Sequence, residues 1–116
     1  MANSGLRHVA LKTRDLVKTE RFYKGILGMK VAFRVPPNMI FFRTSGANDL
    51  LNFVKTNRPI APRRGLDHIG FKVSSRGLKR LEAVLKNNGV PIEGRRGGTA
   101  LYIRDPNGYS IEYYCD

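Results

Sequence analysis

A nine-residue segment near the N-terminus of this chain returns in its second half. Residues 5–13 read GLRHVALKT, and residues 65–73 read GLDHIGFKV. Every difference between the two segments is a conservative or small-residue exchange, except that between Arg7 and Asp67. Self-similarity at a fixed spacing indicates that one supersecondary unit is used twice. The repeat therefore predicts a chain built from two related modules.

The two histidines of the chain, His8 and His68, occupy equivalent positions of this repeat. Each is followed by alternating apolar residues, and the period of a strand places the histidine on the face opposite to them. Ala10 and Gly70 lie on the histidine face and leave space beside the imidazoles. A single strand histidine is more often a core residue than a ligand, but a duplicated pair predicts a shared site.

Both halves of the chain show the pattern of a βαβββ module, which predicts an α+β fold with two modules in tandem. Alternation and turn residues predict strands in the first half at residues 6–13, 29–33, 39–44 and 50–55. The corresponding strands in the second half are predicted at residues 66–73, 90–93, 99–104 and 109–115. One helix is expected over residues 16–27 after an Asp15 N-cap, and another between Ser74 and Gly89.

These modules are expected to form a single domain, residues 1–116. The first module covers residues 5–56, the second covers residues 65–116, and the linker at residues 57–64 is stiffened by Pro59 and Pro62. An Asp-Pro-Asn-Gly sequence at residues 105–108 predicts a tight hairpin turn before the last strand.

Composition limits the functional classes. The chain has 21 Lys and Arg against 9 Asp and Glu, a net charge of +12. This charge favours an anionic small-molecule substrate or weak phosphate contacts with nucleic acid. Nucleic-acid motifs are lacking, so a solvated basic surface is the favoured interpretation. No apolar run predicts a membrane span or signal peptide, and the single cysteine, Cys115, fits a reducing, cytoplasmic location.

The repeat also predicts partners for the two histidines. Glu112 on the last strand corresponds to Asn52 in the first module, and each is flanked by apolar residues. Two imidazoles and one carboxylate, from His8, His68 and Glu112, form a ligand set typical of catalytic divalent metals. Asn52 can add a carbonyl oxygen or a supporting hydrogen bond, or it can simply bond to a neighbouring strand.

Three segments carry a family resemblance across almost the whole chain: RHVALKTRDLVKTERFYKGILGMKV, GLDHIGFKV and YIRDPNGYSIEYY. With them the chain resembles the vicinal oxygen chelate superfamily, which includes glyoxalase I, bleomycin resistance proteins, extradiol dioxygenases and fosfomycin-resistance thiol transferases. The resemblance implies the glyoxalase/bleomycin resistance/dioxygenase-like fold, with sheets curved around a metal site. It also implies that His8, His68 and Glu112 bind one divalent ion (Fe, Mn, Ni or Zn).

Departures from the family patterns separate the subfamilies. Glyoxalase I usually has a glutamate where this chain has Asn52, and fosfomycin enzymes usually have a threonine where it has Ala10. Tyr102 does match a tyrosine of the fosfomycin enzymes, whereas bleomycin-binding relatives lack the metal triad. The expected function is a glyoxalase-like lyase or an extradiol-type dioxygenase. The alternatives are a fosfomycin-type thiol transferase and a non-catalytic small-molecule or drug-binding protein.

Further site residues follow from strand alternation. Lys12 and Lys72 share the histidine face and can complement substrate charge, and Tyr114 shares the face of Glu112 and can act as a proton donor beside it. Each of the three also fits a structural or rim position. The Arg-Arg-Gly-Gly segment at residues 95–98 is either an anion-catching lid or an exposed loop, and the loop is favoured.

A homodimer is expected, because so short a chain leaves an open sheet face that a second copy can cover. The site then lies within one chain or is shared across the dimer.

Overall fold

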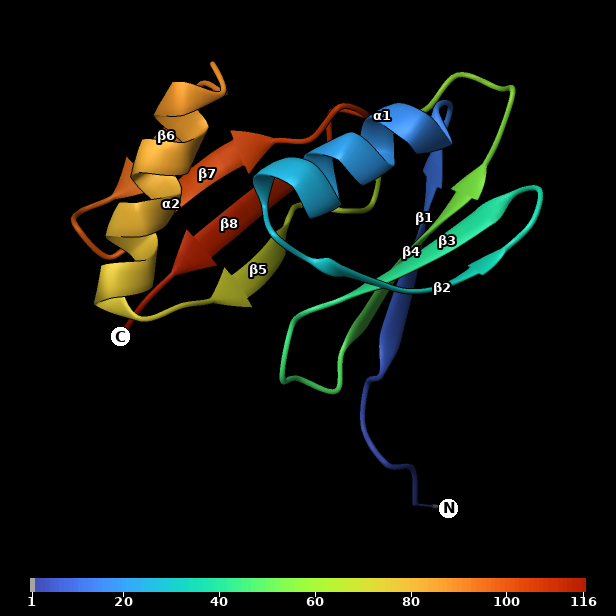
Figure 1. Ribbon diagram of the computed structural model, residues 1–116, viewed down its shortest axis with the longest axis horizontal. Helices are drawn as coiled ribbons and strands as arrows, with labels where there is room; N and C mark the ends of the chain where they lie inside the picture. The colour runs from blue at the N-terminus through green and yellow to red at the C-terminus, as the bar shows by residue number, and fades with distance from the viewer. Residues whose placement is uncertain (1) are drawn as a thin grey trace. The chain divides into compact units, whose positions relative to one another are not determined.

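The computed structural model describes residues 2–116, which divide into two compact units with their boundary between Ile60 and Ala61 (Figure 1). Each unit contains one four-stranded sheet and one helical segment. The predicted α+β class with two modules in tandem is therefore confirmed. No helix in this described range is both long and apolar enough to cross a membrane.

The first unit has its strands in the spatial order β1-β4-β3-β2. The first strand pairs in parallel with β4, and the remaining neighbours are antiparallel. The elements, in chain order, are β1 (His8–Thr13), α1 (Leu16–Glu20), the π-helix η1 (Arg21–Ile26), β2 (Lys30–Val35), β3 (Met39–Arg43) and β4 (Leu50–Lys55).

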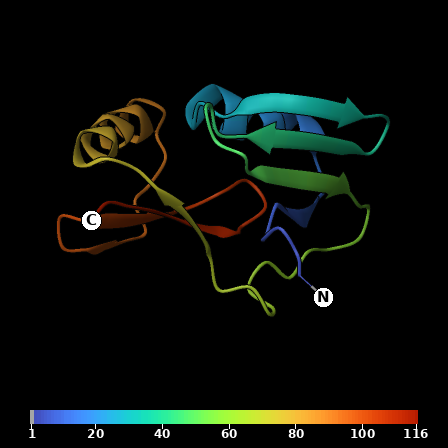
Figure 2. The same cartoon turned by 90° about the horizontal axis from the view of Figure 1, so that it is seen from below.

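The second unit repeats this topology, with the order β5-β8-β7-β6 and a parallel pair between β5 and β8. Helix α2 lies over one face of this sheet (Figure 2). The elements are β5 (Ile69–Lys72), α2 (Ser75–Asn87), β6 (Gly94–Arg96), β7 (Ala100–Arg104) and β8 (Ser110–Tyr114).

Each helix buries its apolar face against the sheet of its own unit. In the first unit the fully buried Tyr23 ring lies 5.0 Å from the Phe53 ring and 5.6 Å from the Phe42 ring, measured between centroids. In the second unit Leu78 and Leu85 of α2 are buried. Each large apolar side chain removed from water contributes about 1.5–3 kcal/mol. The helices thus take one face of each sheet and leave the other for function.

Local signals in the sequence explain the helix starts and the last hairpin. Asp15 accepts a hydrogen bond from the Lys18 backbone nitrogen at 2.9 Å, so the predicted N-cap is confirmed. Ser74 caps α2 in the same way. In the last hairpin Asp105 Oδ1 accepts bonds from two backbone nitrogens, and Gly108 takes the positive φ of 90° that the turn requires.

The first helix and the first strand of the second module differ from prediction. The helix predicted over residues 16–27 is α-helical only to Glu20, and then widens to a π-helix in which the Leu27 nitrogen bonds to the Phe22 oxygen. The strand predicted at residues 66–73 begins only at Ile69, so His68 immediately precedes β5.

The strand predicted at residues 90–93 is wrong. Strand β6 lies at Gly94–Arg96, which overlaps the predicted loop at residues 95–98. Pro91 cannot donate to a strand ladder, so regular pairing starts after it. Arg95 instead pairs with Glu82 of α2, and Arg96 pairs with Glu112 of β8. Two consecutive arginines with partners on opposite faces of the sheet are characteristic of a strand rather than of a loop.

Candidate metal centre

The open face of the second sheet gathers polar side chains from neighbouring strands. Register places Glu112 between Gly70 of β5 and Tyr102 of β7. In the neighbouring pair of strands, Arg96 of β6 lies opposite Ala100 of β7. Because residues directly opposite each other share a face, these strands direct Glu112, Tyr102 and Arg96 to one side. The apolar residues between them, including Leu101 and Ile111, are fully buried.

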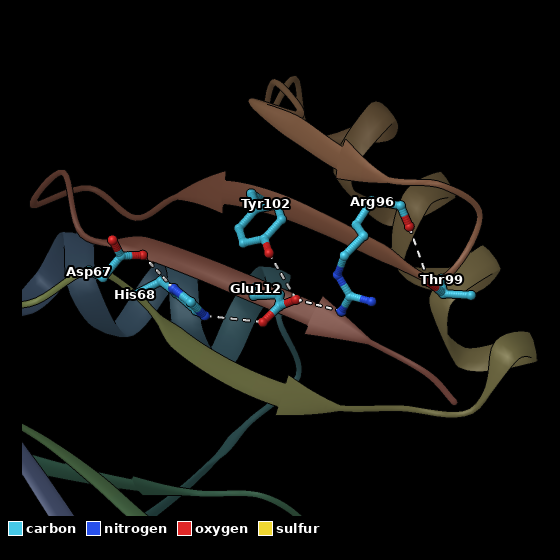
Figure 3. A network of polar contacts seen from close by, with 6 residues as sticks. All are labelled: Asp67, His68, Arg96, Thr99, Tyr102 and Glu112. Atoms are coloured by element: carbon cyan, nitrogen blue, oxygen red, sulfur yellow. Dashed lines mark hydrogen bonds and ion pairs between the residues drawn. The ribbon is translucent and has the colours of Figure 1, made fainter.

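Glu112 is the centre of this group, and its two carboxylate oxygens have different partners (Figure 3). Oε1 lies 3.2 Å from His68 Nε2. Oε2 accepts hydrogen bonds from Arg96 Nη2 and the Tyr102 hydroxyl, both at 3.0 Å. His68 and Arg96 therefore approach the carboxylate from opposite sides. The Glu112 side chain is only 9% exposed.

These contacts keep Glu112 ionised. Burial, the largest single influence, raises the pKa of its carboxyl group. The hydrogen bonds from Arg96 and Tyr102, together with the charges of His68 and Arg96, outweigh burial and bring the pKa of Glu112 below its ordinary value. An ionised, nearly buried carboxylate with one oxygen directed at an imidazole nitrogen is a suitable metal ligand.

The His68 ring is oriented by its neighbour in the sequence. Its Nδ1 lies 2.7 Å from Asp67 Oδ1, and this hydrogen bond is the main reason why the pKa of His68 is raised. With Nδ1 bound to a carboxylate, Nε2 is the nitrogen that faces Glu112. A carboxylate behind the imidazole is the usual arrangement around a metal-binding histidine, because it fixes the ring and its tautomer.

Gly70 lies beside both Glu112 and Tyr114. A Cβ at that position would lie 3.4 Å from Glu112 Oε1 and 3.6 Å from the Tyr114 ring. Tyr114 thus borders Glu112, as predicted from alternation. Its neighbour Tyr113 is buried on the helix side of the sheet, where its ring stacks on Phe71 and burial raises the pKa of its hydroxyl.

The first unit presents the equivalent positions with different chemistry. Asn52 lies between Ala10 and Phe41 in register, just as Glu112 lies between Gly70 and Tyr102. Asn52 is 3% exposed. Its side-chain oxygen, Oδ1, is buried and has no hydrogen-bond partner within residues 2–116.

His8 begins β1, and its ring centroid lies 6.3 Å from that of Phe41. Lys12 is exposed further along the same strand. In the second unit the corresponding Lys72 is also exposed and pairs with Asp116, with 2.7 Å between Nζ and Oδ2.

The structure places two of the three predicted ligands, His68 and Glu112, side by side. The third, His8, belongs to the other unit. No group of three or more His, Cys, Asp or Glu side chains forms a candidate metal cluster in the part of the chain that the structure describes. The two side chains nevertheless fit a divalent ion, because His68 Nε2 and Glu112 Oε1 face each other. The other ring nitrogen of His68 is bound to Asp67, and the other oxygen of Glu112 is bound to Arg96 and Tyr102.

Two members of this cluster were missed by the sequence analysis as site residues. Asp67 is the one non-conservative difference in the repeat, and its position next to His68 in the chain is the signal that identifies it. Arg96 lies in the predicted loop at residues 95–98, and only the β6–β7 pairing brings it to Glu112. No pattern within residues 95–98 distinguishes Arg96 from Arg95.

Comparison with known proteins agrees with this arrangement of two similar modules. The model of the Glyoxalase/Bleomycin resistance protein/Dioxygenase superfamily matches residues 5–113. The chain belongs to this superfamily. The resemblance to vicinal oxygen chelate proteins is thereby confirmed.

Individual relatives are distant. An iron-dependent extradiol dioxygenase from Rhodococcus jostii is 24% identical over 97% of the chain, which spans only 43% of that protein's length. A lactoylglutathione lyase from Agrobacterium tumefaciens has a similar structure, with a TM-score of 0.76, 23% identity and coverage of 99% of this chain and 96% of the other. The fosfomycin resistance protein FosX from Listeria monocytogenes gives a TM-score of 0.80, 22% identity and coverage of 97% and 92%.

Proposed function

We propose that this superfamily member is a divalent-metal-dependent enzyme acting on a small substrate that chelates the metal through two adjacent oxygens. The observation that carries the proposal is the convergence of His68 Nε2 and Glu112 Oε1, 3.2 Å apart, with their opposite atoms already bound. Ligands of one metal ion at bond lengths of about 2.0–2.2 Å lie at such separations. His8 is proposed as the third ligand, either from the same chain or from a second copy in a homodimer.

The bound metal would act as a Lewis acid that polarises the two substrate oxygens. The chain's own residues then have separate tasks. Asp67 holds the His68 ring, while Tyr102 and Arg96 hold the Glu112 carboxylate in its orientation. Tyr114, whose ring lies near Gly70 as Glu112 does, is proposed to give a proton to the substrate or to receive one. Asn52, Lys12, Lys72 and Tyr102 are proposed as substrate contacts.

The reaction is proposed to be that of a glyoxalase-like lyase or an extradiol-type dioxygenase. The name of the Rhodococcus relative specifies iron, and that of the Agrobacterium relative specifies a lyase. Asn52 favours the dioxygenase, because its neutral amide adds no second carboxylate to the two histidines and one glutamate. That set with open positions is typical of iron(II) oxygenases.

Metal content and turnover test the proposal. Protein purified without chelator is expected to contain one divalent ion per chain by elemental analysis, and to consume oxygen with catechols or to isomerise hemithioacetals. Removal of the metal by a chelator should abolish either activity. Metal-free protein that still binds catechols or drugs, without turnover after reconstitution with Fe, Mn, Ni or Zn, would establish a binding protein instead.

Paired variants locate the ligands. Loss of a direct ligand should lower metal affinity by about 100-fold or more in each of three variants, His8→Ala, His68→Ala and Glu112→Gln. Loss of a residue that only supports a ligand costs about 10–100-fold. Glu82→Gln is the matched control, since Glu82 also pairs with an arginine, but on the helix side of the sheet. Full metal binding by His68→Ala would refute the assignment.

A further inference from the structure

We propose that Arg96 binds an anionic group of the substrate and thereby selects carboxylated metal chelators over neutral ones. This inference rests on the proposed function, because it places the anion beside the metal-bound oxygens. It concerns a residue whose side chain is held by Glu112 through Nη2 and is 59% exposed.

The two oxygens of the Glu112 carboxylate have different partners, and this keeps Arg96 in place when a metal binds. The metal-facing oxygen is Oε1, which contacts His68, whereas Arg96 contacts Oε2 at 3.0 Å. A metal bound through Oε1 therefore leaves the Arg96 contact intact. The guanidinium group remains beside the site instead of being displaced from it.

Arg96 also has donors to spare. A guanidinium group carries five N–H donors in a rigid plane. The Arg96 side chain donates to Glu112 through Nη2 and also interacts with the Tyr102 side chain, and it is 59% exposed. The exposed edge offers the paired geometry that carboxylates and phosphates favour.

The neighbouring arginine shows that this position is specific. Arg95 lies on the opposite face of β6, where its Nη1 is 2.7 Å from Glu82 Oε1 of α2. The two arginines have the same charge and the same strand, but only Arg96 is on the face of Glu112. The net charge of +12 attracts anions to the whole surface, and Arg96 adds a defined contact point at the site.

The test compares 3,4-dihydroxybenzoate with catechol, which share the two adjacent hydroxyls and differ by one carboxylate. Zinc-loaded protein is used, because zinc is redox-inert and binds both compounds without oxidising them. We expect wild type to bind the carboxylated compound about tenfold more tightly by calorimetry, as one charge-assisted hydrogen bond predicts. Arg96→Gln should remove this preference, Arg96→Lys should restore part of it, and Arg95→Gln should retain all of it.

A structural role for Arg96 predicts a different result. It would change stability or zinc affinity in Arg96→Gln while leaving the ratio of the two ligand affinities unchanged. An unchanged ratio, or equal affinities in wild type, overturns the inference.

A metal-free arm separates this inference from the proposed function. Benzoate is titrated into protein without metal while the Arg96 Nε–H signal, identified by its loss in Arg96→Gln, is followed by NMR. A saturable shift supports anion binding by Arg96 even if zinc fails to bind, which would refute the metal centre alone. No shift, together with no preference in the zinc-loaded protein, refutes the role of Arg96.

Discussion

The open faces of the two sheets are built from the same positions but differ in chemistry. In the first unit the residues around Asn52 are apolar, and Phe33 and Phe41 stack with ring centroids 4.3 Å apart. Phe33 is 47% exposed, although it is a large apolar side chain. In the second unit the corresponding face carries Glu112 with its three polar partners.

One substitution pair shows how the two faces diverged. Tyr102 and Phe41 hold equivalent register positions opposite Glu112 and Asn52. The Tyr102 hydroxyl donates to Glu112, whereas Phe41 has no hydroxyl and the Asn52 oxygen has no donor. Duplication therefore preserved the backbone geometry, while the charged ligand and its supporting hydrogen bonds are concentrated in one unit. The other unit offers an imidazole, an amide and an apolar surface.

The largest expected effect on stability and metal binding comes from giving the first unit the carboxylate that Glu112 supplies in the second. Asn52→Glu should destabilise the metal-free protein by about 2–4 kcal/mol, because it buries a carboxylate without a partner. If position 52 lies within reach of the metal, the added charged oxygen should tighten metal binding by about tenfold or more. It should also reduce oxygen-dependent activity by occupying an open coordination position.

Metal titration and chemical denaturation of wild type and Asn52→Glu test this prediction. Asn52→Gln is the control, because it adds length without charge. Identical metal affinities for wild type and Asn52→Glu would show that residue 52 lies outside the metal's reach, and the equivalence with Glu112 would then be only structural.

A smaller effect is expected from restoring the missing hydroxyl. Phe41→Tyr gives the buried Asn52 oxygen a donor in the register that Tyr102 uses for Glu112. Satisfying a buried acceptor should raise the free energy of unfolding by about 1 kcal/mol, measured by urea denaturation. The same change in an Asn52→Ala background should give no gain, and an equal gain there would mean that the hydroxyl acts elsewhere.

The smallest effect concerns an ion pair on the surface of the first unit. Arg34 donates to both oxygens of Glu20 at 2.6 and 2.8 Å, and these hydrogen bonds lower the pKa of Glu20. The lowered pKa means that the pair stabilises the fold above the unfolded-state pKa of Glu20, and that this contribution is lost as pH falls through the folded-state value.

Glu20→Gln should therefore lower the melting temperature slightly at neutral pH and not at strongly acidic pH. The difference should also shrink in high salt, because Arg34 is largely exposed. A melting-temperature difference that is constant with pH would show that the charge of Glu20 does not contribute.

Sequence alone determined the repeated architecture and predicted most residues of the candidate site. Strand alternation assigned Glu112 and Tyr114 to one face, because a period of two leaves no choice of face once the apolar residues are buried. The internal repeat identified Asn52 as the counterpart of Glu112. Asp15 and Ser74 marked the helix starts through side-chain capping, which depends only on nearby residues.

Tertiary structure decided what depends on pairing between distant segments. The location of β6 followed from its ladder with β7 and not from the composition of Arg-Arg-Gly-Gly. Only that ladder distinguishes Arg96, bound to Glu112, from Arg95, bound to Glu82. The unpartnered oxygen of Asn52 is likewise a property of what lies across the sheet. Local sequence fixes which face a side chain takes, but register between strands decides which atoms it meets there.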